Sequence, residues 1–300
     1  MPLYLSRFSY TPETWARLIG NPEDRRTAAQ SYTEILQGKA GFQGAVFDVD
    51  GVLVDSPHEH AWRDALEQLM ETSWSAIRDE TRYSPERFTP EVYRAHMSGK
   101  PTFSGARAAL RYFGVPEDDA RIEEYGRRKQ QVMDKLLEAG ELTAYPDALR
   151  FVLVVRGAGI PAGAASSSKN AAQLLSQIRL DAFVEQEDLH FDFIRPGLTL
   201  LDVFAVDVSG RDFAQGGKPH PEIFLTAARE LGVPAAQCFA VEDSVSGVQA
   251  AKAAEMAMIG LARAGEADVL TAADADLVVT TLDEVDLSAF SLGRLARRAG

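Results

Sequence analysis

Short apolar runs alternate with segments of helical periodicity along most of this chain. The first run, at residues 45–47, is Ala-Val-Phe with no polar interruption. Later runs that we expect to be strands lie at 151–155 or 161–165, at 239–241, at 258–261 and at 277–279. Strands that are apolar at every position are typical of a sheet buried on both faces. The alternation therefore predicts an α/β fold, with a parallel sheet covered by helices on both sides.

One long segment breaks the alternation. Residues 57–145 contain two stretches in which apolar residues have helical spacing: Trp62, Ala65, Leu66, Leu69 and Met70, and then Ile122, Tyr125, Val132, Met133 and Leu136. No strand pattern stands out there, so we predict an all-α cap domain at 57–145, inserted into a core of residues 43–56 and 146–300. An insertion after the first strand lies over the carboxyl edge of the sheet, where α/β proteins bind ligands, and is placed to act as a lid.

Residues 1–42 are predicted to be a separate N-terminal extension. A strand around residues 4–10, a helix over 12–36 and a Gly-rich joint at 38–44 are expected there. One strand and one helix cannot bury both of their faces alone. This segment therefore either docks on the rest of the chain or stays mobile.

Charge and composition exclude several classes of partner. The formal net charge of −13 disfavours binding to nucleic acid or to an anionic membrane. No apolar stretch approaches the roughly 20 residues that a membrane span needs, and the start of the chain does not resemble a signal peptide. The single cysteine, Cys238, cannot form an internal disulfide. We therefore expect a cytoplasmic protein, and a monomer, although the sequence does not determine the oligomeric state.

The first motif with chemical meaning follows the first predicted strand. Asp48 and Asp50 flank one valine, and Gly51 then permits a sharp turn. Two acids at the mouth of a cleft can divide phosphoryl transfer between them, one as nucleophile and one as proton donor and acceptor. The alternative is a calcium loop with Glu59 as its last ligand, but Leu53 stands where an EF-hand needs glycine.

Three further motifs follow later predicted strands. They are the hydroxyl-rich stretch 166–170, Lys218 in a Gly/Pro loop, and the acidic pair Glu242-Asp243. Taken singly, each has an ordinary alternative: a helix N-cap, a solvated surface lysine, and an N-capping aspartate. Their order carries more information, because the carboxyl ends of parallel strands share one edge, where all four motifs can converge.

The four motifs together resemble those of the haloacid dehalogenase superfamily, in its β-phosphoglucomutase-like branch, over about residues 43–285. The resemblance implies a Rossmann-like core with a helical cap and a Mg²⁺ cofactor. It also implies roles for individual residues: Asp48 as nucleophile, Asp50 as general acid/base and backbone-carbonyl metal ligand, Ser166 and Lys218 as ligands of the transferring phosphate, and Glu242 and Asp243 as metal ligands beside Asp48.

The same resemblance implies contacts with the rest of the substrate. In the mutase, the counterparts of Ser168, Lys169 and Asn170 hold a second phosphate, while Lys129 resembles the cap lysine and His60 a hinge-side position near the acid/base. The mutase also has a cap arginine where this chain has Thr102, and Lys100 or Arg107 is a candidate replacement. A lysine does not reproduce a bidentate guanidinium.

From these features we expect a Mg²⁺-dependent phosphatase acting on a small phosphorylated metabolite, a sugar phosphate, through an aspartyl-phosphate. The alternatives are a β-phosphoglucomutase-type mutase and, from another class, a non-catalytic binding protein. A dehalogenase needs no metal and so gives no reason for Glu242 beside Asp243. Residues 1–39 resemble the start of GYD-type domains, and the stretch 188–202 is an insertion with no assigned role.

Overall fold

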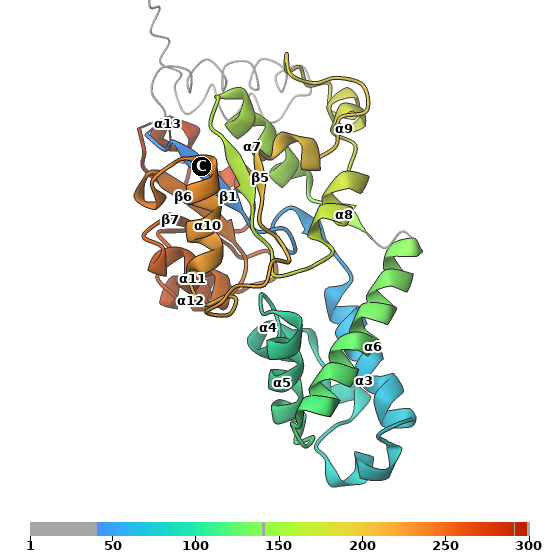
Figure 1. Ribbon diagram of the computed structural model, residues 1–300. Helices are drawn as coiled ribbons and strands as arrows, with labels where there is room; N and C mark the ends of the chain where they lie inside the picture. The colour runs from blue at the N-terminus through green and yellow to red at the C-terminus, as the bar shows by residue number, and fades with distance from the viewer. Residues whose placement is uncertain (1–40, 140–141, 291, 299–300) are drawn as a thin grey trace, which may run out of the picture.

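The computed structural model describes residues 41–139, 142–290 and 292–298, so the predicted N-terminal strand and helix lie outside the described residues. The core is a six-stranded sheet in the order β5-β4-β1-β6-β7-β8, in which every pairing is parallel (Figure 1). The strands are β1 (Gly44–Phe47), β4 (Ala162–Ala164), β5 (Val206–Asp207), β6 (Cys238–Glu242), β7 (Ala257–Leu261) and β8 (Leu277–Val279). The predicted α/β fold is confirmed.

Of the two apolar runs predicted for the second strand, only the later one forms a strand. Residues 162–164 form β4, whereas residues 151–155 lie inside helix α7 (Pro146–Gly157). Almost every residue of α7 from Ala148 to Val155 is buried, so its sequence has the continuous apolar character of a buried strand. Periodicity alone cannot separate these cases. The short edge strand β5 was not predicted, because two half-buried residues make no recognisable run.

Helices cover both faces of the sheet. Ala45 and Phe47 of β1 pack with α7, while Val46 faces a second cluster that includes Phe224 and Val248. This alternation follows from the two-residue period of a strand. The remaining helices of the core are α8 (Ala171–Gln177), α9 (Leu180–Gln186), η3 (Leu201–Val203), α10 (Glu222–Leu231), η4 (Ala235–Gln237), α11 (Val245–Ala253), α12 (Ala267–Ala272), η5 (Leu282–Glu284) and α13 (Leu287–Phe290).

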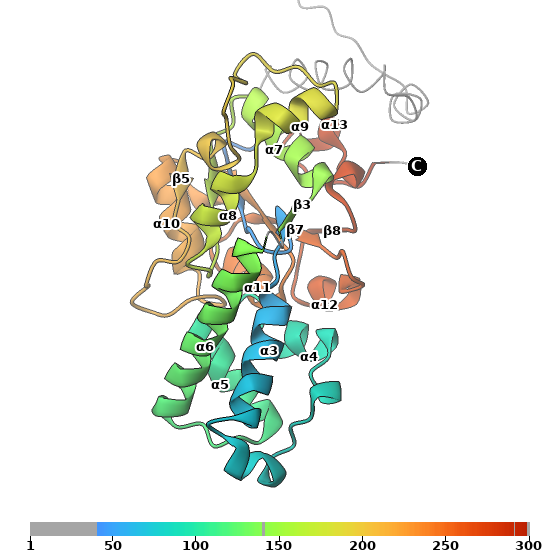
Figure 2. The ribbon, with the colours of Figure 1, turned by 90° about the vertical axis from the view of Figure 1, so that its right-hand side faces the viewer.

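The residues between the first strand and α7 form a helical layer at one end of the sheet (Figure 2). Its helices are α3 (His58–Glu71), η1 (Ser75–Glu80), η2 (Pro85–Arg87), α4 (Pro90–His96), α5 (Thr102–Phe113) and α6 (Asp119–Glu138). The chain leaves the core through β2 (Val54–Asp55) and returns through β3 (Thr143–Ala144), and these two strands pair antiparallel. Within the described ranges, no helix is both long and apolar enough to cross a bilayer.

The insertion at residues 188–202 packs on the core. Phe191, Leu198 and Leu200 are buried in the same cluster as α7, and the backbone N–H of Leu200 donates to Ile178 O at 2.9 Å. The insertion therefore extends the hydrophobic core on one face of the sheet, away from the strand ends that carry the polar motifs.

Candidate active site

The carboxyl ends of β1 and β6 bring the first and last acidic motifs together. The two strands pair in register, with Phe47 opposite Val241, and the Asp48 N–H donates to Val241 O at 3.0 Å. Gly51 makes this approach possible, because it has a φ of +80° and because a Cβ there would lie 2.0 Å from Asp243 Oδ2. Only glycine fits both constraints.

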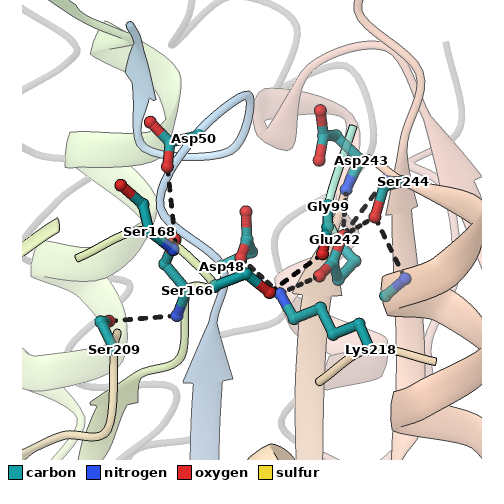
Figure 3. Close-up of polar contacts among 12 residues, drawn as sticks. Asp48, Asp50, Gly99, Ser166, Ser168, Ser209, Lys218, Glu242, Asp243 and Ser244 are labelled. Atoms are coloured by element: carbon teal, nitrogen blue, oxygen red, sulfur yellow. Dashed lines mark hydrogen bonds and ion pairs between the residues drawn. The ribbon is translucent and has the colours of Figure 1, made fainter. Parts of the chain in front are cut away.

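Lys218 joins two of these acids from the loop before α10. Its Nζ lies 2.5 Å from Asp48 Oδ1 and also contacts Glu242 Oε1 (Figure 3). The lysine and glutamate side chains are fully buried. Burial opposes the charged form of the lysine, but Asp48 and then Glu242 outweigh it and raise the pKa of Lys218. A permanent positive charge therefore lies directly beside Asp48.

Asp48, Glu242 and Asp243 form the one group of potential metal ligands found among the described residues, each offering an oxygen within 4.8 Å of the others. Burial is the largest cause that raises the pKa of Asp48, with Lys218 opposing it and Glu242 and Asp50 adding to it. Burial, Glu242 and Asp48 likewise raise the pKa of Asp243. Three carboxylates face one lysine, so the group lacks positive charge. An all-oxygen donor set of this kind suits a hard divalent cation.

Glu242 is held by the start of the following helix as well as by Lys218. Its Oε2 accepts hydrogen bonds from the N–H groups of Asp243 and Ser244, both at 3.1 Å, and from Ser244 Oγ at 2.9 Å. Ser244 in turn caps α11 by accepting from the Gly247 N–H at 3.1 Å. The carboxylate of Glu242 therefore has a single defined position.

Ser166 lies across the cleft from this acidic group, just beyond β4. Its N–H donates to Ser209 Oγ at 3.0 Å, and its own hydroxyl accepts from the Ser168 N–H at 3.0 Å (Figure 3). The hydroxyl also donates to Asp50 Oδ2 at 3.3 Å. These contacts aim the Ser166 hydroxyl at the space between Asp48 and Asp50. Ser209 was not predicted, because nothing in its local sequence points to this loop.

Asp50 is surrounded by donors. Ser56 Oγ donates to Asp50 Oδ1, and His58 Nε2 lies 3.3 Å from Asp50 Oδ2. Burial is the largest single influence and raises the pKa of Asp50. The charge and hydrogen bond of His58, the Ser56 hydrogen bond and Lys129 together lower it to about 2. Asp50 is therefore ionised in this arrangement.

The histidine near Asp50 is His58 rather than the predicted His60. His58 is buried, while His60 is exposed and is not part of the cavity lining. Both belong to the first turn of α3, and residues two apart on a helix point to different faces. The spacing to Trp62 provided a signal, because residues four apart share a face and Trp62 is buried.

Four of the predicted substrate-binding residues line a cavity of about 210 Å³ between the strand ends and the cap, whereas Asn170 and His60 do not. Asp48, Asp50, Ser166, Ser168, Lys169, Lys100 and Lys129 all line it, together with Asp243. Lys129 is buried and its Nζ lies 2.8 Å from His58 Nδ1. Lys100 Nζ donates to His96 O at 2.6 Å. These cations offset the acidic character of the whole chain at the place where an anion would enter.

Lys169 and Asn170 already have partners in this structure. Lys169 Nζ lies 3.8 Å from Asp212 Oδ1, and both side chains are largely exposed. Asn170 Oδ1 accepts from Gln130 Nε2 of α6 at 2.9 Å, while its Nδ2 is buried without a hydrogen-bond partner among the described residues. Arg94 and Arg263 also line the cavity and were not among the predicted residues.

Known proteins resemble this chain in amino-acid sequence. A sequence model of the haloacid dehalogenase-like hydrolase family matches residues 42–255. β-Phosphoglucomutase of Mycobacterium bovis is 30% identical over 290 residues, which span 91% of this chain and 96% of that protein. Hexitol phosphatase A of Escherichia coli is 26% identical and spans 82% of this chain and 94% of its own length.

Solved structures lead to the same group. The crystal structure of β-phosphoglucomutase from Pyrococcus sp. strain ST 04 superposes with a TM-score of 0.57 at 25% identity, covering 84% of this chain and 99% of that one. The region matched by the family model includes all four polar motifs, from Asp48 to Asp243. The chain therefore belongs to the haloacid dehalogenase-like hydrolase family and, within it, to the β-phosphoglucomutase-like branch.

Proposed function

We propose that this enzyme hydrolyses a small phosphorylated metabolite, a sugar phosphate, through an aspartyl-phosphate on Asp48. The observation that carries the proposal is the position of Asp48: it stands at a strand end, 2.5 Å from the buried Lys218, and faces a cavity lined by Asp50 and Ser166. The comparisons support the same reaction class, since one relative is named a β-phosphoglucomutase and another a hexitol phosphatase.

The proposed cofactor is Mg²⁺, held by Asp48, Glu242 and Asp243 with a backbone carbonyl from Asp50. The oxygen-only donor set and the raised pKa values of Asp48 and Asp243 support this assignment, because a divalent cation would offset both the burial and the mutual repulsion that raise them. When bound, the cation supplies charge neutralisation for the phosphoryl oxygens.

The chain's own residues carry the chemical steps. Asp48 attacks phosphorus in line, and the bond from phosphorus to the ester oxygen breaks as Asp50 protonates that oxygen. Lys218 and the Ser166 hydroxyl stabilise the charge on the transferring group. Asp50 then accepts a proton from the water that hydrolyses the phospho-enzyme. A phosphoryl dianion placed beside Asp50 raises its pKa, so the proton that Asp50 donates is taken up together with the substrate.

A β-phosphoglucomutase activity is the second candidate. It is supported by the 30% identity to a protein of that name over 91% of the chain, and by the positions of Ser168 and Lys169 on the cavity wall. We place it second because a mutase must grip two phosphates, and here Asn170 already accepts from Gln130 and Thr102 stands in place of the cap arginine.

Phosphorus NMR separates the two reactions. The protein is mixed with Mg²⁺, β-glucose 1-phosphate and a trace of the bisphosphate. Inorganic phosphate supports the hydrolase, whereas glucose 6-phosphate without phosphate release supports the mutase. The absence of turnover both with this substrate and with a panel of other sugar phosphates would contradict both candidates. A parallel sample with a chelator in place of Mg²⁺ is expected to stay unchanged, and full turnover there would refute the metal assignment.

The variant Asp48→Asn tests the nucleophile. We expect turnover to fall at least about a thousandfold with the fold intact, since the amide cannot attack phosphorus. Asp64→Asn on α3, whose partner is the neighbouring Arg63, is the matched control and should keep wild-type activity. Retention of turnover in Asp48→Asn would show that the nucleophile is a different residue.

A further inference from the structure

Arg263 lies between the loop that follows Asp50 and the segment that returns from the cap, and it has no role in the proposed reaction steps. It lies on the loop after β7, lines the cavity, and has a side chain that is 18% exposed. Its Nε donates to Gly51 O at 3.1 Å and its Nη2 donates to Val52 O at 3.2 Å. These two carbonyls belong to the residues that immediately follow Asp50, so the guanidinium grips the loop that presents the acid/base.

The same guanidinium also holds the segment by which the chain returns from the cap. Nη2 lies 3.1 Å from Asp147 Oδ1, and the guanidinium carbon lies 3.8 Å from the centre of the Tyr145 ring. Tyr145 is tied to the catalytic loop as well, because its N–H donates to Leu53 O at 3.0 Å. Arg263 therefore joins the loop after Asp50 to the hinge of the cap.

Asp147 gives this connection a rigid support. Its Oδ2 accepts from Thr281 Oγ1 and from the Leu282 N–H, both at 2.8 Å. Asp147 is buried at the start of α7, and burial, which alone would raise its pKa, is outweighed by the Leu282 N–H and by Arg263, which lower it. The carboxylate is thus charged and fixed to the core, and Arg263 transmits that fixed position to the Gly51–Val52 carbonyls.

The contacts need the shape of arginine. A planar fork that stacks on an aromatic ring can serve two carbonyls and one carboxylate at once, whereas a lysine offers one point charge on a flexible stem. We propose that Arg263 is a positioning residue for the acid/base: it holds the loop after Asp50 and the cap hinge in one register, so that Asp50 points at the leaving oxygen. This inference rests on the proposed function, in which Asp50 protonates that oxygen.

The test compares two substrates that differ in how much they need that proton. Phenyl phosphate has a poor leaving group, while dinitrophenyl phosphate has a good one that departs without protonation. With Mg²⁺ present, kcat/KM reports the steps up to departure of the leaving group. General acid catalysis contributes roughly 10²–10⁴-fold, so misplacing Asp50 should lower kcat/KM for phenyl phosphate by about 30-fold or more.

The variants are Arg263→Lys and Arg263→Met, with Arg150→Met as the matched control. Arg150 belongs to α7 and pairs with Glu187 and Asp283, but it does not contact the catalytic loop. We expect both Arg263 variants to lose activity on phenyl phosphate and to lose less than about 5-fold in kcat/KM on dinitrophenyl phosphate. Arg150→Met should keep wild-type kcat/KM on both substrates. Tyr145→Leu, which removes the stacking on Arg263 and keeps the backbone bond to Leu53, should show the same selectivity with a smaller loss.

The outcomes are distinguishable. An equal loss on both substrates would overturn the inference, because it would mean that Arg263 supports the whole site or binds substrate directly. An unchanged rate on phenyl phosphate would also overturn it. If either Arg263 variant fails to give a cooperative thermal transition, the inference is judged on Tyr145→Leu, by the ratio of its kcat/KM values on the two substrates relative to wild type. The proposed function itself would be refuted if the wild-type protein released no phosphate from dinitrophenyl phosphate or from any sugar phosphate of the panel.

Discussion

His58 lies between a charged residue of the cap, Lys129, and a charged residue of the core, Asp50. Lys129 Nζ lies 2.8 Å from Nδ1 of His58, and the other ring nitrogen, Nε2, faces the core. That nitrogen lies 3.3 Å from Asp50 Oδ2 and 3.2 Å from Ser168 Oγ. One imidazole ring thereby links Lys129 of the cap to Asp50 of the core.

The variant His58→Ala is expected to lower kcat/KM for a sugar phosphate by about 10- to 100-fold, because Asp50 loses the partner that orients it and lowers its pKa. His60→Ala is the matched control, two residues along the same helix and exposed, and should stay within about threefold of wild type. Steady-state kinetics measures both. Equal effects of the two substitutions would contradict the assignment.

Lys129 makes the reaction sensitive to alkaline pH. Burial lowers its pKa to about 8, with Asp50 and Asp134 opposing the shift. Below about pH 8 the Lys129 ammonium is charged and stabilises ionised Asp50 through its charge, and above that pH the charge is lost. We therefore expect kcat/KM to fall as the pH rises through about 8. In Lys129→Arg, whose guanidinium stays charged, any remaining activity should lack this alkaline limb.

The same shift has a consequence for stability. Folding favours the neutral form of Lys129, so between about pH 8 and its ordinary value of 10.5 the unfolded chain binds more protons than the folded one. Stability contributed by this group therefore rises with pH across that window. Urea unfolding of wild type against Lys129→Met measures the difference, and a difference that does not change between pH 8 and 10 would contradict the shift.

At the scale of elements, the junction of β6 with α11 shapes the site. The strand ends at Glu242, Ser244 caps the helix, and Gly247 in the first helical turn lies directly against the Glu242 carboxylate. A Cβ at position 247 would lie 1.8 Å from Glu242 Oε1. A side chain there would displace the carboxylate that holds Lys218, although helical φ and ψ angles by themselves permit any residue.

Gly247→Ala is accordingly expected to lower activity by more than about tenfold and to destabilise the protein by about 1–3 kcal/mol, the usual cost of overpacking. Gln249→Ala, on the exposed face of the same helix, is the control for helix propensity and should change neither quantity. Thermal unfolding and steady-state rates measure both effects. Wild-type behaviour of Gly247→Ala would mean that Glu242 has no fixed role.

At the scale of the whole molecule, a few polar contacts close the cap over the cavity. Arg94 Nε of α4 lies 3.0 Å from Glu266 Oε1 in the core, and Ser167 Oγ donates to Gly99 O of the cap at 3.0 Å. The helical layer lies over the strand ends in both ribbon views (Figures 1 and 2). The position of the cap over the strand ends therefore depends on interactions between parts of the chain that are far apart in sequence.

A double-mutant cycle of Arg94→Met and Glu266→Gln tests this closure. Each single variant is expected to raise KM about threefold, and the pair should couple by about 0.5–1 kcal/mol, as partly exposed ion pairs do. Arg111→Met removes a pair with Glu117 that lies within the cap and should leave KM unchanged. Additive effects of the two substitutions would show that the ion pair does not stabilise closure.

Much of this architecture could be predicted from the amino-acid sequence alone, because its signals are local. The apolar run before Asp48, the order of the four polar motifs and the helical stretch after the first of them identify a parallel sheet with a cap. The shared edge of parallel strands then brings Asp48, Ser166, Lys218 and Asp243 together. The local sequence could not decide whether residues 151–155 form a strand or a helix, because an element that is buried on all sides has no polar face to reveal its periodicity.

The remaining features depend on partners that are remote along the chain. Whether His58 or His60 faces Asp50 depends on where α3 begins and how it packs against α6. The roles of Arg94 and Arg263 depend on Glu266, Gly51 and Asp147, whose distance in sequence ranges from 116 to 212 residues. A cation on a loop has no periodicity and many rotamers, so only the packed structure selects the contact that it makes.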